Sequence, residues 1–84
     1  MAGSLKKFGW SVVDTSALGD GYPDITAGKR GVTELFEVKG DSGSLTPAQI
    51  EFIARWRGSP VRVVKSGIDA LRQVGEVANK PPPY

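Results

Sequence analysis

The chain has 84 residues, of which 39% are hydrophobic and 24% are charged, as expected for a single small globular domain and not for a disordered segment. It contains no cysteine and no histidine, which excludes disulfides, zinc-thiolate sites, serine-histidine triads and an imidazole base. Any catalysis must therefore depend on carboxylates, lysine and a hard metal ion with oxygen ligands, Mg²⁺ or Mn²⁺.

Eleven basic and nine acidic residues give a net charge of +2, a mild preference for polyanionic partners. No apolar run approaches the roughly 18 residues of a membrane span, and no secretion signal is recognisable. We therefore expect a soluble intracellular protein without a membrane partner.

The first expected elements are a short basic helix that ends over residues 5–8 and a β-branched, aromatic strand over residues 10–14. A loop rich in glycine follows. Two short strands over residues 24–27 and 32–39 come next, joined by a tight turn at residues 28–31.

If Gly28 faces Gly31 across a two-residue turn, Asp24 lies opposite Leu35 and one diagonal step from Glu37. Side chains alternate along a strand, so Asp24, Glu37 and Lys39 share one face of the sheet. The residues between them, Phe36 and Val38, point to the other face, where they can form core.

Residues 44–58 carry the clearest helix signals: Thr46 as N-cap, Pro47 at the first helical position, and Gln49 completing a capping box. Apolar residues at helical spacing predict a buried stripe, formed by Ile50, Ile53 and Ala54 and widened by Phe52 and Trp56.

A strand over residues 60–64 and a last helix that Ser66 caps and Gly75 follows complete the domain. The order is helix, three strands, helix, strand, helix, with the first helix short or truncated. It predicts an α/β fold in which helices flank a small mixed sheet. We expect one domain over residues 1–75 and a loose, proline-rich tail over residues 76–84.

Two carboxylates and a lysine on one sheet face have two explanations. The first is a surface patch in which Lys39 neutralises Glu37 or Asp24, worth less than about 1 kcal/mol. The second is a site in which Asp24, Glu37 and the backbone carbonyl of Val38 hold one divalent cation near a scissile phosphate. Lys39 would then orient water and stabilise negative charge.

The segments "GYPDI" and "ELFEVKG" resemble the motif of the PD-(D/E)XK nuclease superfamily, and "SLTPAQIEFI" with "GSPVRVVKSGIDAL" is similar to its VRR-NUC branch, which is related to Holliday junction resolvases. The resemblance covers about residues 9–74. It implies a restriction-endonuclease-like core, metal binding by Asp24 and Glu37, catalysis by Lys39, and a supporting role for Gln49.

The activity implied is a Mg²⁺- or Mn²⁺-dependent endonuclease that hydrolyses phosphodiester bonds in DNA, with structured or branched DNA favoured. We expect the protein to be located in the cytoplasm, which is that of a bacterial host cell if a phage encodes the protein. A homodimer is also expected, since so small a domain gains stability from a second copy.

Other residues have competing interpretations. The capping box already explains Gln49, Tyr22 is either a base-stacking or a packed residue, and Glu34 falls on the face opposite Glu37. Candidate phosphate contacts are Lys29 and Arg30 in the hairpin tip, and further Lys6, Lys7, Arg55, Arg57, Arg62 and Lys65.

One departure from the nuclease pattern is that residues 1–9 contain no acid, where relatives carry a glutamate on the first helix. The metal site could be completed by Asp14, by Asp20 or by a group from a second subunit. Alternatively, the site binds a single metal ion weakly. Two further functions stay open: a nucleic-acid-binding module without catalysis, and a structural interaction domain.

Overall fold

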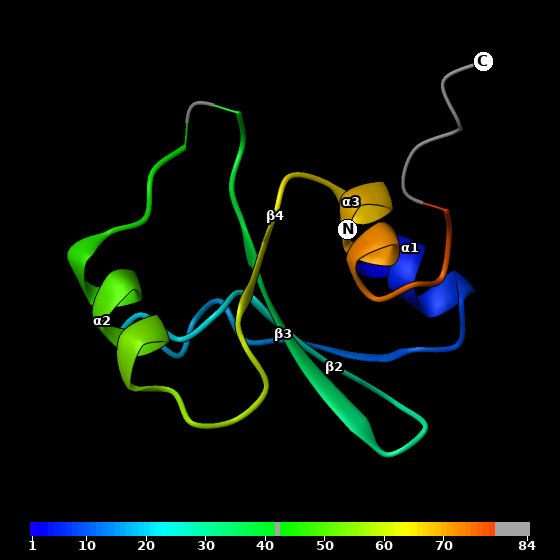
Figure 1. Cartoon of the computed structure of the whole chain (residues 1–84), viewed down its shortest axis with the longest axis horizontal. Helices are drawn as coiled ribbons and strands as arrows, with labels where there is room; N and C mark the ends of the chain where they lie inside the picture. The colour runs from blue at the N-terminus through cyan, green and yellow to red at the C-terminus, as the bar shows by residue number, and fades with distance from the viewer. Residues whose placement is uncertain (42, 79–84) are drawn as a thin grey trace.

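The computed structural model describes residues 1–41 and 43–78, which form a four-stranded sheet and three helices (Figure 1). In chain order the elements are α1 (Ala2–Lys7), β1 (Ser11–Asp14), β2 (Ile25–Lys29), β3 (Val32–Val38), α2 (Pro47–Arg55), β4 (Arg62–Val64) and α3 (Gly67–Gln73). This is the predicted order of elements.

The sheet is mixed, with strand order β1-β2-β3-β4. The first three strands pair antiparallel, and β3 and β4 pair parallel because α2 lies in the connection between them. The predicted α/β class with a small mixed sheet is confirmed. The last strand is shorter than expected and begins at Arg62 instead of Pro60.

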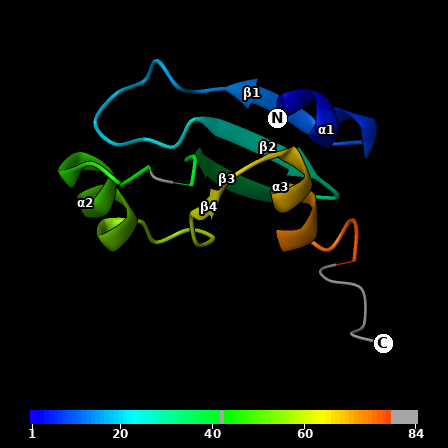
Figure 2. The ribbon, with the colours of Figure 1, turned by 90° about the horizontal axis from the view of Figure 1, so that it is seen from above.

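The hydrophobic core lies on one face of the sheet, which we call the core face. It combines inward residues of the strands with those of α1 and α3, which pack on each other beside the sheet (Figure 2). Its buried members are Leu5, Trp10, Ile25, Ala27, Phe36, Val64, Ala70 and Leu71. The opposite face, which carries Thr26, Leu35 and Glu37, is called the site face below.

The register of the β2–β3 hairpin differs from the prediction by two residues. Lys29 pairs with Val32 across a two-residue turn made of Arg30 and Gly31. Both turn residues have positive φ, +54° and +77°, as in a type I′ turn, where glycine is favoured in the second place. The predicted turn had no glycine at its centre, which is why it was wrong.

Helix α2 begins as predicted but is not buried as predicted. The hydroxyl of Thr46 accepts a hydrogen bond from Gln49 N (3.2 Å), and Gln49 Oε1 accepts one from Thr46 N (2.8 Å), so the capping box is complete. None of its residues is buried, however, and Ile50 remains 55% exposed. The helix lies at one end of the sheet, away from α1 and α3 (Figure 1).

The link between α2 and the rest of the fold includes a close backbone approach at Gly21. This residue has a φ of +78°, and a Cβ placed on it would lie 2.2 Å from the carbonyl oxygen of Ala48. Only glycine allows the loop before β2 to pass so near the first turn of α2.

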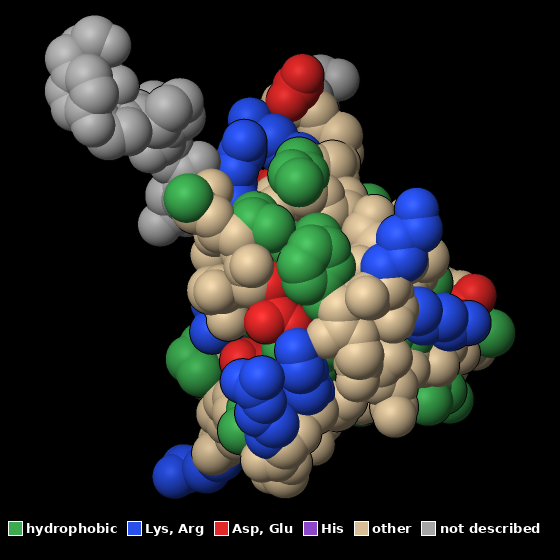
Figure 3. Space-filling view, turned by 90° about the vertical axis from the view of Figure 1, so that its right-hand side faces the viewer, with side chains coloured by type: hydrophobic (Ala, Val, Ile, Leu, Met, Phe, Trp, Pro, Cys, Tyr) green, Lys and Arg blue, Asp and Glu red, His purple; other side chains and the backbone are tan. Residues whose placement is uncertain are grey.

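The end of the molecule with α1, α3 and the hairpin shows acidic side chains among basic ones (Figure 3). The ammonium of Lys29 forms an ion pair with Glu76 and donates to the carbonyl of Phe8 (2.6 Å), while Trp10 Nε1 donates to Glu76 (2.8 Å). Lys29 was expected in the turn, but it is the last residue of β2 and pairs with Val32.

The loose tail was expected from residue 76, but Glu76 is held by these contacts and Val77 packs against the core. Residues 79–84 lie outside the part of the chain that the structure describes. Within the described ranges, no helix is long and apolar enough to cross a membrane.

We predict that Gly21→Ala lowers the free energy of unfolding by clearly more than about 1 kcal/mol, the usual cost of a Cβ at positive φ, because the methyl group also meets Ala48. Urea denaturation measures this. Gly19→Ala is the matched control, since its φ is +76° and no atom lies within 4 Å of the added Cβ. Equal losses in the two variants would contradict the close approach.

Candidate active site

The observed hairpin register places the two expected metal ligands against each other. Ile25 pairs with Phe36, and continuing the antiparallel pairing by one residue puts Asp24 directly opposite Glu37. The prediction had them one diagonal step apart. Because the shift is two residues, an even number, both carboxylates stay on the site face, as does Lys39.

Backbone contacts fix the position of Asp24 just before β2. Its Oδ2 accepts a hydrogen bond from the amide of Val38 (3.0 Å), and its carbonyl accepts one from the amide of Thr15 (2.8 Å). On the other side of β3, Glu37 is paired with Val63 of β4. The acidic pair therefore lies where three strands and the following loops meet.

Glu37 is almost fully buried, with 2% of its surface exposed, while Asp24 is partly exposed. Burial, a hydrogen bond to Asp24 and the charge of Asp24 raise the pKa of Glu37 to about 7, and Lys39 opposes this only partly. Burial beside a second carboxyl group thus disfavours the charged form of Glu37. A ligand reaches the pair from the side of Asp24.

Lys39 follows β3 directly, and its amide donates to the carbonyl of Val64 (2.9 Å). Its side chain is half-buried, and among the described residues no carboxylate lies within ion-pairing distance of its ammonium. An ion pair of this kind is what the first interpretation predicts, in which Lys39 neutralises Glu37 or Asp24 in a surface patch. Lys39 is instead close enough to affect Glu37 electrostatically while its ammonium has no carboxylate partner.

The oxygen donors here fit Mg²⁺ or Mn²⁺, which accept one or two carboxylates and complete their coordination with water and phosphate oxygens. Asp24 and Glu37 supply two carboxylates, and the carbonyl of Val38 is adjacent in sequence. The raised pKa of Glu37 also fits, since a buried carboxyl group beside another acid is stabilised in its charged form by a cation that replaces its proton.

A third acidic ligand is not present in the described part of the chain, where no three Asp or Glu residues come together. Asp14 pairs with Ile25 and so belongs to the core face, and its Oδ1 accepts hydrogen bonds from Ser16 (2.6 and 3.0 Å). Neither Asp14 nor Asp20 completes the site.

Two supporting residues have structural partners. Gln49 takes part in the capping box with Thr46, as the structural interpretation of this residue requires. The ring of Tyr22 contacts Phe52 edge to face (5.3 Å between centroids), and its hydroxyl lies 3.2 Å from that of Thr26. Tyr22 is thus packed in this structure, and an active-site role for either residue stays a prediction.

Several basic residues expected to meet phosphate have partners within the fold. Arg62 makes a bidentate ion pair with Glu34 (3.0 and 3.3 Å) and donates to the carbonyl of Gln73, which ties β3, β4 and α3 together. Glu34 is therefore structural and lies on the core face, as expected. Lys65 pairs with Asp41 (3.2 Å) in an exposed position.

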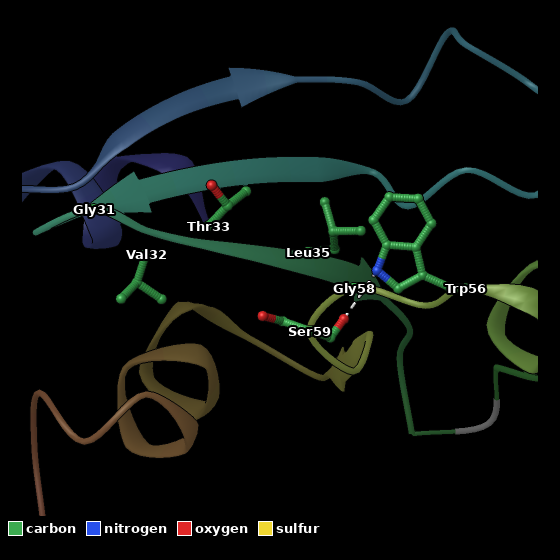
Figure 4. A pocket seen from close by; sticks show the side chains of 7 residues that line it. All are labelled: Gly31, Val32, Thr33, Leu35, Trp56, Gly58 and Ser59. Carbon is green, nitrogen blue, oxygen red and sulfur yellow. Dashed lines mark hydrogen bonds between the residues drawn. The ribbon is translucent and has the colours of Figure 1, made fainter.

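Trp56 was expected in the buried stripe of α2, but it is 41% accessible. It borders a groove on the site face together with Leu35, Gly58 and Ser59 (Figure 4). The arginines on either side of it in the sequence were the available sign that this position is not core.

Comparison with known proteins finds no match among protein-family models, curated proteins or solved structures.

We predict that the fold is more stable at pH 5 than at pH 8 because of Glu37. The pKa of Glu37 is about 7 in the folded protein and 4.5 in the unfolded chain. Its favourable contribution to the free energy of unfolding is therefore complete below about pH 4.5 and disappears as the pH rises through 7. The expected loss is up to about 3 kcal/mol.

Urea unfolding at pH 5 and pH 8 measures this difference, and Glu37→Gln should abolish most of it. The lowered pKa values of Asp14 and Glu76 do not interfere, because their contributions are lost only at pH values below that window. A pH dependence that is unchanged in Glu37→Gln would contradict the raised pKa of Glu37.

Proposed function

We propose that the chain is a Mg²⁺- or Mn²⁺-dependent endonuclease that hydrolyses phosphodiester bonds in DNA. The observation that carries this proposal is the direct opposition of Asp24 and Glu37, with Lys39 on the same sheet face and without a carboxylate partner in the described residues. Such a set of groups can catalyse phosphate hydrolysis without a histidine.

The residues have separate roles. Asp24 and Glu37 would hold the cation, with the carbonyl of Val38, and the amide of Val38 keeps Asp24 oriented. When bound, the cation would supply charge neutralisation at the phosphate and activation of water. Lys39 would contact a non-bridging phosphate oxygen and stabilise the negative charge that grows in the transition state.

The substrate preference we propose is structured or branched DNA, and the assembly is a homodimer in the cytoplasm with a restriction-endonuclease-like core. The element order and the D…E-x-K spacing of Asp24, Glu37 and Lys39 support this assignment. The homodimer follows from the small size of the domain, which gains stability from a second copy.

A nucleic-acid-binding module without catalysis is the second candidate. The observation in its favour is that the acidic pair has no third acidic ligand in the described part of the chain. A site of two carboxylates holds a cation less tightly than a site of three. Such a protein would bind DNA without cleaving it.

The test of the nuclease is a cleavage panel of flaps, junctions and duplexes with Mn²⁺. We predict that Lys39→Ala, Asp24→Asn and Glu37→Gln each reduce the rate at least about a hundredfold, the usual cost of removing one group that stabilises the transition state. DNA binding should persist in Lys39→Ala.

Asp14→Asn is the matched control, since it changes an acid of the core face and should leave cleavage unchanged. A wild-type protein that binds these DNAs but cuts none of them refutes the nuclease. Calorimetric titration with Mn²⁺ then separates the candidates: absence of metal uptake by the wild type leaves the binding module.

A further inference from the structure

Trp56 is held in place although 41% of its surface is accessible. Its ring is stacked on Phe52, with 5.2 Å between centroids and 18° between planes, and its Nε1 donates to the carbonyl of Ser59 (3.0 Å). The polar atom of the indole is therefore satisfied inside the protein, and the ring is oriented before any ligand arrives.

Gly58 also holds the ring. A Cβ added there would lie 2.8 Å from Nε1 of Trp56 and 2.9 Å from the adjacent ring carbon, so only glycine lets the chain pass this close. Contacts with Phe52, Gly58 and Ser59 thus keep an indole ring rigid at the surface. A rigid aromatic ring binds a planar ligand at low entropic cost.

The ring borders a groove of about 350 Å³ between β3 and the segment that leads to β4 (Figure 4). Leu35 and Thr33 line the groove from β3. Leu35 lies two residues before Glu37 on the same strand, and this spacing places them on one face about 7 Å apart. The groove and the acidic pair therefore share the site face.

The charges around Trp56 complement a polyanion. Arg55 and Arg57 flank it in the sequence, and both side chains line a hollow beside the ring. Within the described part of the chain, the one ion-pair contact of Arg55 is a long and exposed one with Glu51 (3.8 Å), which leaves its guanidinium available to a ligand. A hydrophobic protein partner would not need this pair of cations, whereas a nucleic-acid strand would.

We propose that Trp56 is the stacking platform for an unpaired base of single-stranded DNA, with Arg55 and Arg57 contacting the phosphates on either side of that base. This inference deepens the proposed function and rests on it for the choice of DNA. It places a single-stranded segment along the site face, so that one nucleotide is bound beside the Asp24–Glu37 pair. Substrates with an unpaired segment are then bound in preference to plain duplex.

The test is binding of labelled oligothymidylate in EDTA, measured by anisotropy, so that neither metal nor cleavage is involved. We predict that Trp56→Leu weakens binding roughly 5- to 150-fold, as expected for the loss of one base–aromatic stack, and that Trp56→Phe weakens it less. Phe8→Leu is the matched control, because Phe8 is similarly exposed (39%) and also follows basic residues, but lies by α1.

The intrinsic fluorescence of the wild type gives a second readout. Trp10 is buried and hydrogen-bonded to Glu76, so quenching by the oligonucleotide reports Trp56. We expect quenching by oligothymidylate and little by an abasic strand of equal length, which has the same phosphates but no bases. Circular dichroism confirms that the Leu and Phe variants fold.

The proposal is overturned if the abasic strand binds and quenches as strongly as oligothymidylate, or if Trp56→Leu binds as tightly as Phe8→Leu. It is also overturned if dilution alone changes the fluorescence of Trp56, since the ring would then be covered by a second copy of the chain. Failure of cleavage with intact, Trp56-dependent binding would refute the nuclease but not the stacking platform.

Discussion

The pairing of β2 with β3 is the constraint on which the rest of the structure depends. The type I′ turn at Arg30 and Gly31 fixes the register, and the register places Ile25 against Phe36 in the core. The next pair along the strands is Asp24 and Glu37, on the other face. One set of hydrogen bonds thus both completes the core and brings two carboxylates together, at the cost of burying Glu37 and raising its pKa.

The two sheet faces are covered to different extents. Helices α1 and α3 cover the core face, whereas on the site face Leu35 and Glu37 are buried but Val13 and Val63 stay exposed. A helix that covered this face completely would also remove the ammonium of Lys39 from water, and among the described residues no carboxylate lies within ion-pairing distance of it. The partial exposure of α2 follows from this division.

The sequence predicted what depends on local rules. Side-chain alternation assigned Asp24, Glu37, Lys39 and Glu34 to their faces correctly, even with the wrong register, because the error was an even number of residues. The capping box of Thr46 and Gln49 was likewise correct, since all its atoms lie within one helical turn.

What failed depends on contacts between distant residues. Helical spacing cannot distinguish an apolar stripe that is covered from one that is not, which is why Trp56 was expected in the core. The partner of Lys29 is Glu76, 47 positions away, and no local pattern indicates such a pair. Predicting that the two carboxylates lie directly opposite each other requires the correct turn residues. Those residues can be identified only if one knows which two of them adopt positive φ.

The contacts of Glu76 have a practical meaning for handling the protein. By holding Trp10 and Lys29, this residue keeps the last described segment on the same end of the molecule as α1, where the N-terminus also lies, opposite α2 (Figure 1). An affinity tag, a fluorophore or a surface linker attached at the N-terminus is thus placed at the end of the molecule opposite α2. Protein immobilised through its N-terminus should therefore present α2 freely.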